Sequence, residues 1–129
     1  FVADRLIARG SILALPVVER RDAPLVFRAW TPGEAMVPDA LGVPAPPPTA
    51  QVLEPDLIIA PLLAFDRRGG RLGQGGGYYD RTLEALRGSR RLFVLGLAHA
   101  GQEVEAVPMD PNDQRLDAIL TDLGYIEVG

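Results

Sequence analysis

Residues 69–77 place glycines at a spacing that suits a phosphate-binding loop. Six glycines fall within these nine residues, at Gly69, Gly70, Gly73, Gly75, Gly76 and Gly77. A helical pattern follows, because Tyr79, Leu83 and Leu86 share one face. Glycines let the backbone approach an anion closely, and the first N–H groups of a helix are unpaired. The stretch therefore predicts an anion-binding loop, and a flexible surface turn is the alternative.

Charged side chains flank these glycines. Arg71 lies within the cluster, and Asp80 and Arg81 follow it, a combination typical of a nucleotide-phosphate site. The stretch is not a Walker loop, because no Gly-Lys-Ser/Thr follows, and Tyr78 stands where the dinucleotide fingerprint needs its last glycine. Asp80 and Glu84 are like charges one helical turn apart, which a divalent metal or solvent exposure would explain.

Three other polar residues could take part in chemistry. His99, the only histidine, comes just after an apolar strand, where open α/β sheets place ligands. It has no partner carboxylate at an identifiable spacing, so a structural role is favoured over a catalytic one. Asp117 directly precedes an apolar run and is expected at the edge of a sheet, while residues 110–113 are expected to form a solvated turn. Asp66 is expected to cap the turn at residues 67–70 and not to bind metal.

Two apolar segments should position the loop. Residues 57–60 are all apolar, without the alternation of apolar and polar residues seen in half-exposed strands. They predict a strand that is covered on both faces and ended by Pro61. Residues 92–98 predict a second such strand, and a right-handed crossover would place both strands in one parallel sheet. Residues 119–121 and 125–128 predict a small hairpin. The expected fold class is α/β, with a mostly parallel sheet flanked by helices.

The first half of the chain predicts several smaller elements. Residues 1–9 read as the end of a helix stopped by Gly10, and residues 12–15 and 25–30 as a hairpin whose first strand Pro16 ends. Arg28 should then point out of the core. Residues 31–34 form a capping-box pattern that predicts a short helix. The five prolines of residues 43–55 predict an extended, solvated crossing loop, and a ligand for an SH3-type module is the less favoured interpretation.

Composition narrows the class of protein. The 129 residues, 47% hydrophobic and 23% charged, predict a single domain over residues 1–129. A net charge of -4 argues against a general binder of nucleic acid or anionic membranes. There is no cysteine, and no apolar run approaches the about 20 residues of a membrane span. We expect a cytoplasmic protein with neither a nucleic-acid nor a membrane partner. Phe1 already lies inside an amphipathic pattern, so the chain is expected to begin partway into a longer one.

The motifs also carry a family resemblance. The run from Pro61 to Arg81, PLLAFDRRGGRLGQGGGYYDR, follows the strand DLIIA and precedes VPMDPNDQRLD. This order resembles the 5-formyltetrahydrofolate cyclo-ligase family, also called methenyltetrahydrofolate synthetase, across essentially the whole chain. The resemblance implies a fold related to the ribose-phosphate isomerase and CoA-transferase-like group, and a monomer when complete.

The resemblance further implies conversion of 5-formyltetrahydrofolate to 5,10-methenyltetrahydrofolate, with ATP and Mg²⁺ and with release of ADP and phosphate. The formyl oxygen is phosphorylated, the neighbouring folate nitrogen attacks the activated carbon, and phosphate departs. The resemblance assigns ATP binding to Arg71, Leu72, Gly73, Gln74, Gly75, Gly76, Gly77, Tyr78 and Tyr79. It assigns folate binding to Gln74, Gly75, Gly76, Gly77 and Tyr78. It assigns catalytic roles to Arg71 and Tyr78, and magnesium binding to Asp80 and Asp117. Tyr79 is expected to be buried, and Tyr78 to face the ligand.

The chain departs from the family pattern in two places. Gln74 and Gly76 stand where some relatives have basic side chains, and the N-terminal segment that supplies a lysine, an arginine and a glutamate in relatives is not in this chain. A non-catalytic nucleotide- or folate-binding relative is therefore the alternative, and a phosphosugar isomerase is a third interpretation. An apolar patch around Phe1, Leu6 and neighbouring sheet residues is also expected.

Overall fold

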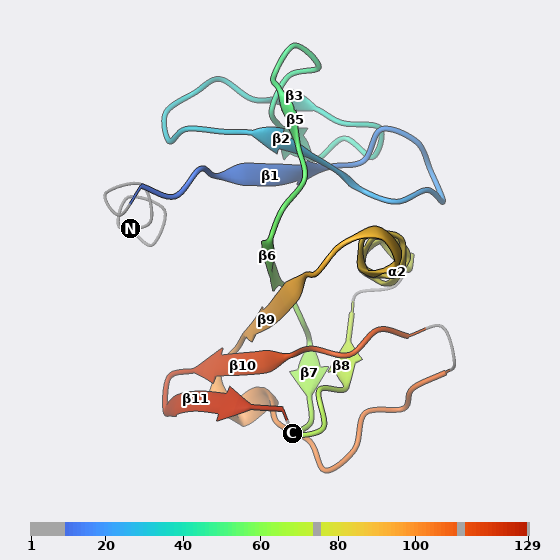
Figure 1. The fold of residues 1–129 in the computed structure, drawn as a ribbon, viewed down its shortest axis with the longest axis vertical. Helices are drawn as coiled ribbons and strands as arrows, with labels where there is room; N and C mark the ends of the chain where they lie inside the picture. The colour runs from blue at the N-terminus through green and yellow to red at the C-terminus, as the bar shows by residue number, and fades with distance from the viewer. Residues whose placement is uncertain (1–9, 74–75, 111–112, 129) are drawn as a thin grey trace. The chain divides into compact units, whose positions relative to one another are not determined.

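The computed structural model describes residues 10–73, 76–110 and 113–128 (Figure 1). They fall into two compact units, Phe1–Pro55 and Asp56–Gly129, which are described separately below. The expectation of a single domain stays a prediction. The helix end predicted over residues 1–9 lies outside the described residues.

The first unit contains a three-stranded antiparallel sheet. Its strands are β1 (Ala14–Val17), β2 (Val26–Ala29) and β5 (Val52–Leu53), in the order β1-β2-β5. The predicted hairpin of β1 and β2 is confirmed, but Pro16 does not end the first strand, since it pairs with Phe27. A proline is tolerated here because β1 is an edge strand of the sheet, where a missing N–H interrupts no second ladder.

The helix predicted to start at Thr31 is wrong. The Glu34 N–H donates to the Thr31 carbonyl at 3.1 Å, and Gly33 has a φ of 92°. A proline followed by a glycine with positive φ is the pattern of a type II turn, which the capping-box interpretation overlooked. The turn leads into β3 (Val37–Pro38), which pairs with β4 (Pro44–Ala45).

The proline-rich segment is only partly the solvated loop that was predicted. Ala45 is 1% exposed and lies in β4, and Val52–Leu53 joins the three-stranded sheet as β5. Between these strands the Ala50 N–H donates to the Pro47 carbonyl at 2.9 Å and closes a turn. The segment therefore folds back on its own unit, because two-residue strands and a turn tolerate proline where a long strand would not.

The second unit is built on a mixed four-stranded sheet. Its strands are β6 (Leu57–Ala60), β9 (Phe93–Leu97), β10 (Ala118–Thr121) and β11 (Gly124–Glu127), in the order β11-β10-β9-β6. β6, β9 and β10 are parallel, as predicted for β6 and β9, while β10 and β11 form the predicted hairpin. The α-helix α2 (Tyr78–Ser89) follows β6 in the chain and precedes β9, which confirms the strand, helix, strand unit.

The expectation of helices flanking a mostly parallel sheet needs correction. Among the described residues α2 is the single α-helix, and the other helical element is the short 3-10 helix η1 (Ala100–Gln102). Between β6 and α2 the chain forms an antiparallel hairpin of β7 (Ala64–Phe65) and β8 (Arg71–Leu72). Two-residue strands give too little alternation to be recognised in the sequence.

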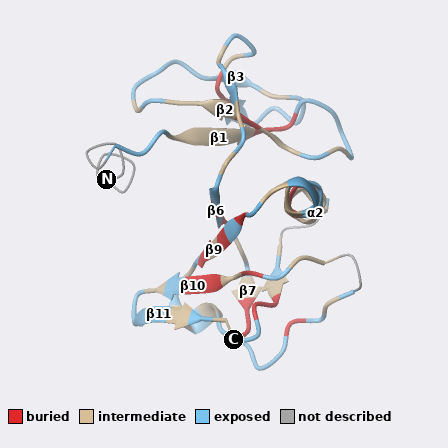
Figure 2. Cartoon of the chain, viewed as in Figure 1, coloured by how far each residue is buried: buried red, intermediate tan, exposed pale blue. Residues whose placement is uncertain are grey.

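The two faces of the sheet differ in burial, which the uniform apolar runs did not indicate. Ile58, Val94 and Ile119 are buried on one face. On the other face Leu57 is 49% exposed and its directly paired neighbour Phe93 is 42% exposed. Figure 2 shows that β9 contains both buried and exposed residues. The prediction that residues 57–60 are covered on both faces is therefore wrong. In the part of the chain that the structure describes, no helix has the length and apolarity needed to cross a bilayer.

Candidate functional site

The turn between β7 and β8 is organised by Asp66. Its side chain is 1% exposed, and Oδ1 accepts the N–H groups of Arg68 and Gly70, each at 2.9 Å. Oδ2 accepts the Val107 N–H at 2.8 Å. Burial alone would raise the pKa of Asp66, but these three backbone donors outweigh it and hold the pKa below its usual value. The prediction that Asp66 caps this turn is confirmed.

Two of the six clustered glycines serve this turn. Gly69 has a φ of 85°, and a Cβ on Gly70 would overlap the Asp66 carboxylate. The Gly69 carbonyl also accepts the Leu116 N–H at 2.8 Å. Residues 69–77 are therefore not one loop. The first two glycines complete a hairpin turn, and only the later ones lead into the helix.

The later glycines shape the start of α2. Gly76 and Gly77 have φ values of 81° and 68°, which favour glycine over any residue with a Cβ. Gly77 is the N-cap residue of the helix, and as a glycine it has no side chain with which to cap the first N–H groups of α2. Arg81 ties the loop to the helix, because its Nη1 donates to the Gly76 carbonyl at 2.5 Å and its guanidinium lies 5.7 Å from the centre of the Tyr78 ring. Gln74 and Gly75 lie outside the described residues.

Arg71 places a second cation beside this helix start. It lies on β8, its Nε donates to the Pro61 carbonyl at 2.7 Å, and its guanidinium is 5.1 Å from the centre of the Tyr79 ring. Burial lowers the pKa of Arg71, and the negative charge of Asp80 opposes that shift. The structure therefore brings together Arg71, Tyr79 and Asp80. Of the other residues assigned to ATP, Leu72 is exposed, and Gly73 lies close to the Arg71 guanidinium.

The two tyrosines are both half-buried. Burial raises the pKa of Tyr79, and the charge of Arg71 lowers it again in part. Tyr79 thus lies against a cation as well as against the apolar face that contains the fully buried Leu83. The prediction that Tyr78 faces the ligand while Tyr79 is buried stays a prediction.

The segment that leads into β10 is tied to α2 at both ends of the helix. In the first turn, Asp80 Oδ1 accepts the Gln114 N–H at 2.9 Å. In the last turn, Arg87 Nη2 donates to the Arg115 carbonyl at 2.7 Å and to Asp117 Oδ2 at 3.1 Å. Asp117 Oδ2 also accepts the Val94 N–H at 2.7 Å, which joins this segment to β9. Sequence analysis missed Arg87, for which a basic residue in the last helical turn was the available signal.

The two acidic residues assigned to magnesium lie at different points along α2: Asp80 is in its first turn, and Asp117 contacts Arg87 in its last turn. Positions 80 and 87 of the helix are two turns apart, or about 10 Å along its axis. Within residues 10–73, 76–110 and 113–128, no group of three His, Cys, Asp or Glu side chains is arranged to hold a metal ion. Asp80, at the start of α2, suits an ion that also binds phosphate oxygens. Asp117 is neutralised by Arg87, so its place in a shared magnesium site stays a prediction.

His99 has a structural contact that explains its position. It precedes η1, its backbone N–H donates to Gln102 Oε1 at 2.7 Å, and its carbonyl accepts the Gln102 backbone N–H at 2.9 Å. This contact agrees with the structural role that the sequence favoured.

Known proteins resemble this chain both in sequence and in fold. The family model described as the 5-formyltetrahydrofolate cyclo-ligase family matches residues 1–122. The 5-formyltetrahydrofolate cyclo-ligase of Mycolicibacterium smegmatis is 34% identical over 126 residues, which cover 92% of this chain and 63% of that protein. The Escherichia coli K12 protein of the same name is 36% identical over 123 residues, which cover 92% of this chain and 67% of that protein.

Solved structures give the same relationship. The 5,10-methenyltetrahydrofolate synthetase of Aquifex aeolicus matches with a TM-score of 0.76 at 27% identity, covering 98% of this chain and 63% of that chain. The Mycoplasma pneumoniae synthetase matches with a TM-score of 0.66 at 26% identity, covering 98% and 62%. This chain spans somewhat less than two thirds of the length of these structural relatives. It belongs to the 5-formyltetrahydrofolate cyclo-ligase family.

Proposed function

We propose that the protein is an ATP-dependent ligase that cyclises 5-formyltetrahydrofolate to 5,10-methenyltetrahydrofolate, releasing ADP and phosphate. The observation that carries the proposal is the position of Arg71, stacked on Tyr79 and close to Asp80 at the start of α2. A cation beside a helix N-terminus suits the phosphates of a nucleotide. Membership of the family supplies the substrate class.

In this proposal the backbone around Gly76 and Gly77 binds the phosphates, and the neighbouring side chains orient them. Gly76 and Gly77 present backbone without a Cβ, so the phosphates can approach the first N–H groups of α2. Arg71 neutralises charge on the transferring phosphoryl group, and the Pro61 carbonyl and the Tyr79 ring hold its guanidinium in place. Gln74, Gly75 and Tyr78 would border the folate, in the roles that the sequence assigned to them.

Magnesium would be held by Asp80, together with phosphate oxygens, and by Asp117 if its contact with Arg87 opens. When bound, the ion would neutralise charge on the phosphates during transfer to the formyl oxygen. No side chain needs to act as a nucleophile, because the folate nitrogen attacks the activated carbon. The protein then contributes positioning and charge neutralisation.

The test is an absorbance assay for methenyltetrahydrofolate with ATP and Mg²⁺, run on the complete gene product. Turnover is expected, and Arg71→Met should lower kcat/KM by about 10- to 100-fold, since a charge-assisted contact contributes about 1.5–3 kcal/mol. Arg91→Met, at an exposed arginine that follows α2, is the matched control and should leave turnover unchanged. No turnover from the complete wild-type product would refute the proposal.

A non-catalytic nucleotide- or folate-binding protein is the alternative. One departure from the expected pattern favours it: the family resemblance implies basic side chains at positions 74 and 76 in some relatives, and this chain has Gln74 and Gly76 there. Calorimetry with ATP and with 5-formyltetrahydrofolate separates the two functions. Binding of both ligands without formation of methenyltetrahydrofolate would support the alternative.

A further inference from the structure

The first unit contains a cavity that the proposed function does not use. Its volume is about 300 Å³. Its walls are mainly apolar, with contributions from Val17, Val37 and Pro46. Three charged side chains also line it, Glu19, Arg28 and Asp39. A mostly apolar hollow with a few polar groups is the usual form of a small-molecule site.

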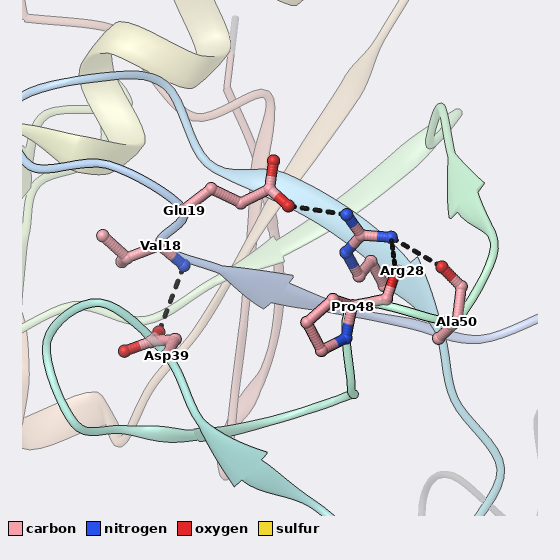
Figure 3. A network of polar contacts seen from close by, with 6 residues as sticks. All are labelled: Val18, Glu19, Arg28, Asp39, Pro48 and Ala50. Carbon is pink, nitrogen blue, oxygen red and sulfur yellow. Dashed lines mark hydrogen bonds and ion pairs between the residues drawn. The ribbon is translucent and has the colours of Figure 1, made fainter.

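Arg28 is held in place at the wall of this cavity. Its Nη1 donates to the carbonyls of Pro48 and Ala50, at 3.0 and 2.6 Å, and its Nη2 donates to Glu19 Oε2 at 2.6 Å (Figure 3). Its side chain is only 12% exposed, so the expectation that Arg28 points away from the core is wrong. The reason is that the carbonyls of the proline-rich segment fold over it. The guanidinium would keep its orientation without Glu19, because the two carbonyls contact a different nitrogen.

The Arg28 guanidinium also has a donor that the described residues leave unused. Its Nε is buried, and no described residue accepts a hydrogen bond from it. A buried donor without an acceptor is destabilising, so an acceptor that reached it would be bound favourably.

The two carboxylates of the cavity differ in how firmly they are held. Asp39 accepts three backbone N–H groups, from Val18 at 3.1 Å, Leu41 at 2.9 Å and Val43 at 3.1 Å, so its charge is already compensated. Glu19 makes one contact to Arg28, and its side chain is 42% exposed. Glu19 can therefore turn into solvent at small cost, whereas Asp39 cannot.

We propose that this cavity binds a small organic carboxylate with an apolar body, whose carboxylate replaces Glu19 on Arg28. An arginine presents a fork of donors that matches a carboxylate, and the apolar walls take the hydrocarbon part of the ligand. The displaced Glu19 leaves the local charge balanced, because one carboxylate replaces another. The apolar walls disfavour inorganic phosphate, because they cannot replace the hydration of the oxygens that Arg28 does not reach. The proposal uses only the first unit and does not depend on the proposed function.

The test is a calorimetric titration of the full chain with 2-naphthoate, with 2-naphthamide as an uncharged probe of the same shape. The carboxylate should bind and the amide should bind at least about tenfold more weakly. Arg28→Met should weaken 2-naphthoate binding by about 10- to 100-fold, because a charge-assisted hydrogen bond is lost. Glu19→Gln should instead tighten it by about two- to fivefold, because the competing carboxylate is removed.

Arg28→Met should weaken 2-naphthoate binding and Glu19→Gln should tighten it, and these opposite effects distinguish a binding site from a structural ion pair. Glu34→Gln and Arg21→Met, at exposed residues of the same unit outside the cavity, are the matched controls and should change nothing. Because Arg28→Met removes two contacts to the proline-rich segment, its amide NMR spectrum must match that of the wild type. If it does not, Arg28→Lys, which keeps the charge but loses the fork, replaces it and should also bind more weakly. Equal binding of acid and amide, no binding by either wild type or Glu19→Gln, or weaker binding by Glu19→Gln would each overturn the proposal.

Discussion

Arg87 Nη2 lies 3.1 Å from Asp117 Oδ2, at the end of α2 opposite the glycine loop. The same nitrogen donates to the Arg115 carbonyl at 2.7 Å, and Arg87 Nη1 reaches Gln114 Oε1 at 3.3 Å. One arginine thus holds three successive parts of the segment that leads into β10. The segment carries Asp117, and it also contacts Asp80 through the Gln114 N–H. The position of both acidic residues therefore depends on how this segment lies along α2.

Arg87→Met should destabilise the second unit. The arginine contacts one carboxylate, one backbone carbonyl and one side-chain amide oxygen, but its side chain is 25% exposed, so solvent screening reduces the value of these contacts. We expect a loss of about 1–2 kcal/mol in the free energy of unfolding, measured by urea denaturation at pH 7. Arg91→Met, just after the helix, should lie within about 0.5 kcal/mol of the wild type. An unchanged urea midpoint for Arg87→Met would show that the segment is held without it.

Asp80→Asn and Asp117→Asn should both raise the Mg²⁺ concentration needed for ATP binding, if the two residues share the ion as proposed. Loss of one carboxylate removes a hard oxygen ligand and a negative charge from the site. The measurement is ATP calorimetry at a series of Mg²⁺ concentrations, with Glu84→Gln, one turn along α2 from Asp80, as the control. An Asp117→Asn protein with the wild-type Mg²⁺ dependence would assign Asp117 to the Arg87 contact alone.

Asp66 should make the second unit sensitive to acid. Its folded-state pKa lies below the ordinary value of 3.8, so the unfolded chain binds a proton more readily than the folded one. The stabilisation is therefore complete above about pH 4 and is lost as the pH falls through the folded-state pKa. Asp66→Asn should lose about 2–3 kcal/mol of stability at pH 7, because one amide oxygen cannot accept all three backbone N–H groups.

The difference between Asp66→Asn and wild type should shrink as the pH falls below the ordinary pKa of the carboxyl group. Urea denaturation at pH 7 and pH 3 measures it. Glu105→Gln, an exposed acidic residue of the same unit, is the control and should show no such pH dependence. A constant difference at both pH values would mean that Asp66 stabilises the turn by packing and not by its charge.

Gly77→Val should abolish ATP binding while the unit stays folded. A residue with a Cβ at a φ of 68° is strained by about 1–2 kcal/mol, and the side chain would stand at the opening of the helix N–H groups. Gly88→Ala is the matched control, because Gly88 lies inside α2 and a Cβ there would meet no other atom within 4 Å. It should raise stability by about 0.5–1 kcal/mol and leave ATP binding intact. Wild-type ATP affinity in Gly77→Val would exclude this helix start as the phosphate site.

Sequence patterns predicted the elements whose signal is local and repeated. The apolar runs at residues 57–60 and 92–98 became parallel strands, and the Asp122-Leu123-Gly124 turn predicted the hairpin of β10 and β11. The Asp66 turn was predictable because an aspartate followed by two glycines at that spacing is typical of a turn. Patterns failed where the same residues suit two structures. Thr31-Pro32-Gly33-Glu34 reads as a capping box and as a type II turn, and the positive φ of Gly33 decides for the turn.

The candidate site was only partly accessible to the same reasoning. Arg71, Tyr79 and Asp80 were predicted together, since they flank one motif. The division of the glycine cluster between a hairpin turn and a helix start was not predicted. The strands β7 and β8 have two residues each, which is too short to show the alternation of a strand. Arg28 was misjudged for a similar reason. Its neighbours in the strand indicated an outward side chain, but the carbonyls that cover it come from residues 48 and 50.

Residues 1–129 on their own should self-associate through the exposed face of the four-stranded sheet. Leu57 pairs with Phe93, and Leu97 with Leu120, and all four are at least 40% exposed on that face. We expect these neighbouring apolar side chains to form a patch larger than the few hundred Å² that soluble monomers usually expose. The patch expected around Phe1 and Leu6 lies outside the described residues, so the sheet residues carry this prediction.

Leu97→Thr with Leu120→Thr should therefore reduce association without unfolding the sheet, because threonine suits a strand and both leucines are at least 40% exposed. Sedimentation velocity over a range of protein concentrations measures the association. Val94→Thr, at a buried position on the opposite face of β9, is the contrasting variant and should lower stability by about 1–3 kcal/mol without relieving association. A wild-type chain of these 129 residues that sediments as a monomer at every concentration would show that the exposed face does not drive association.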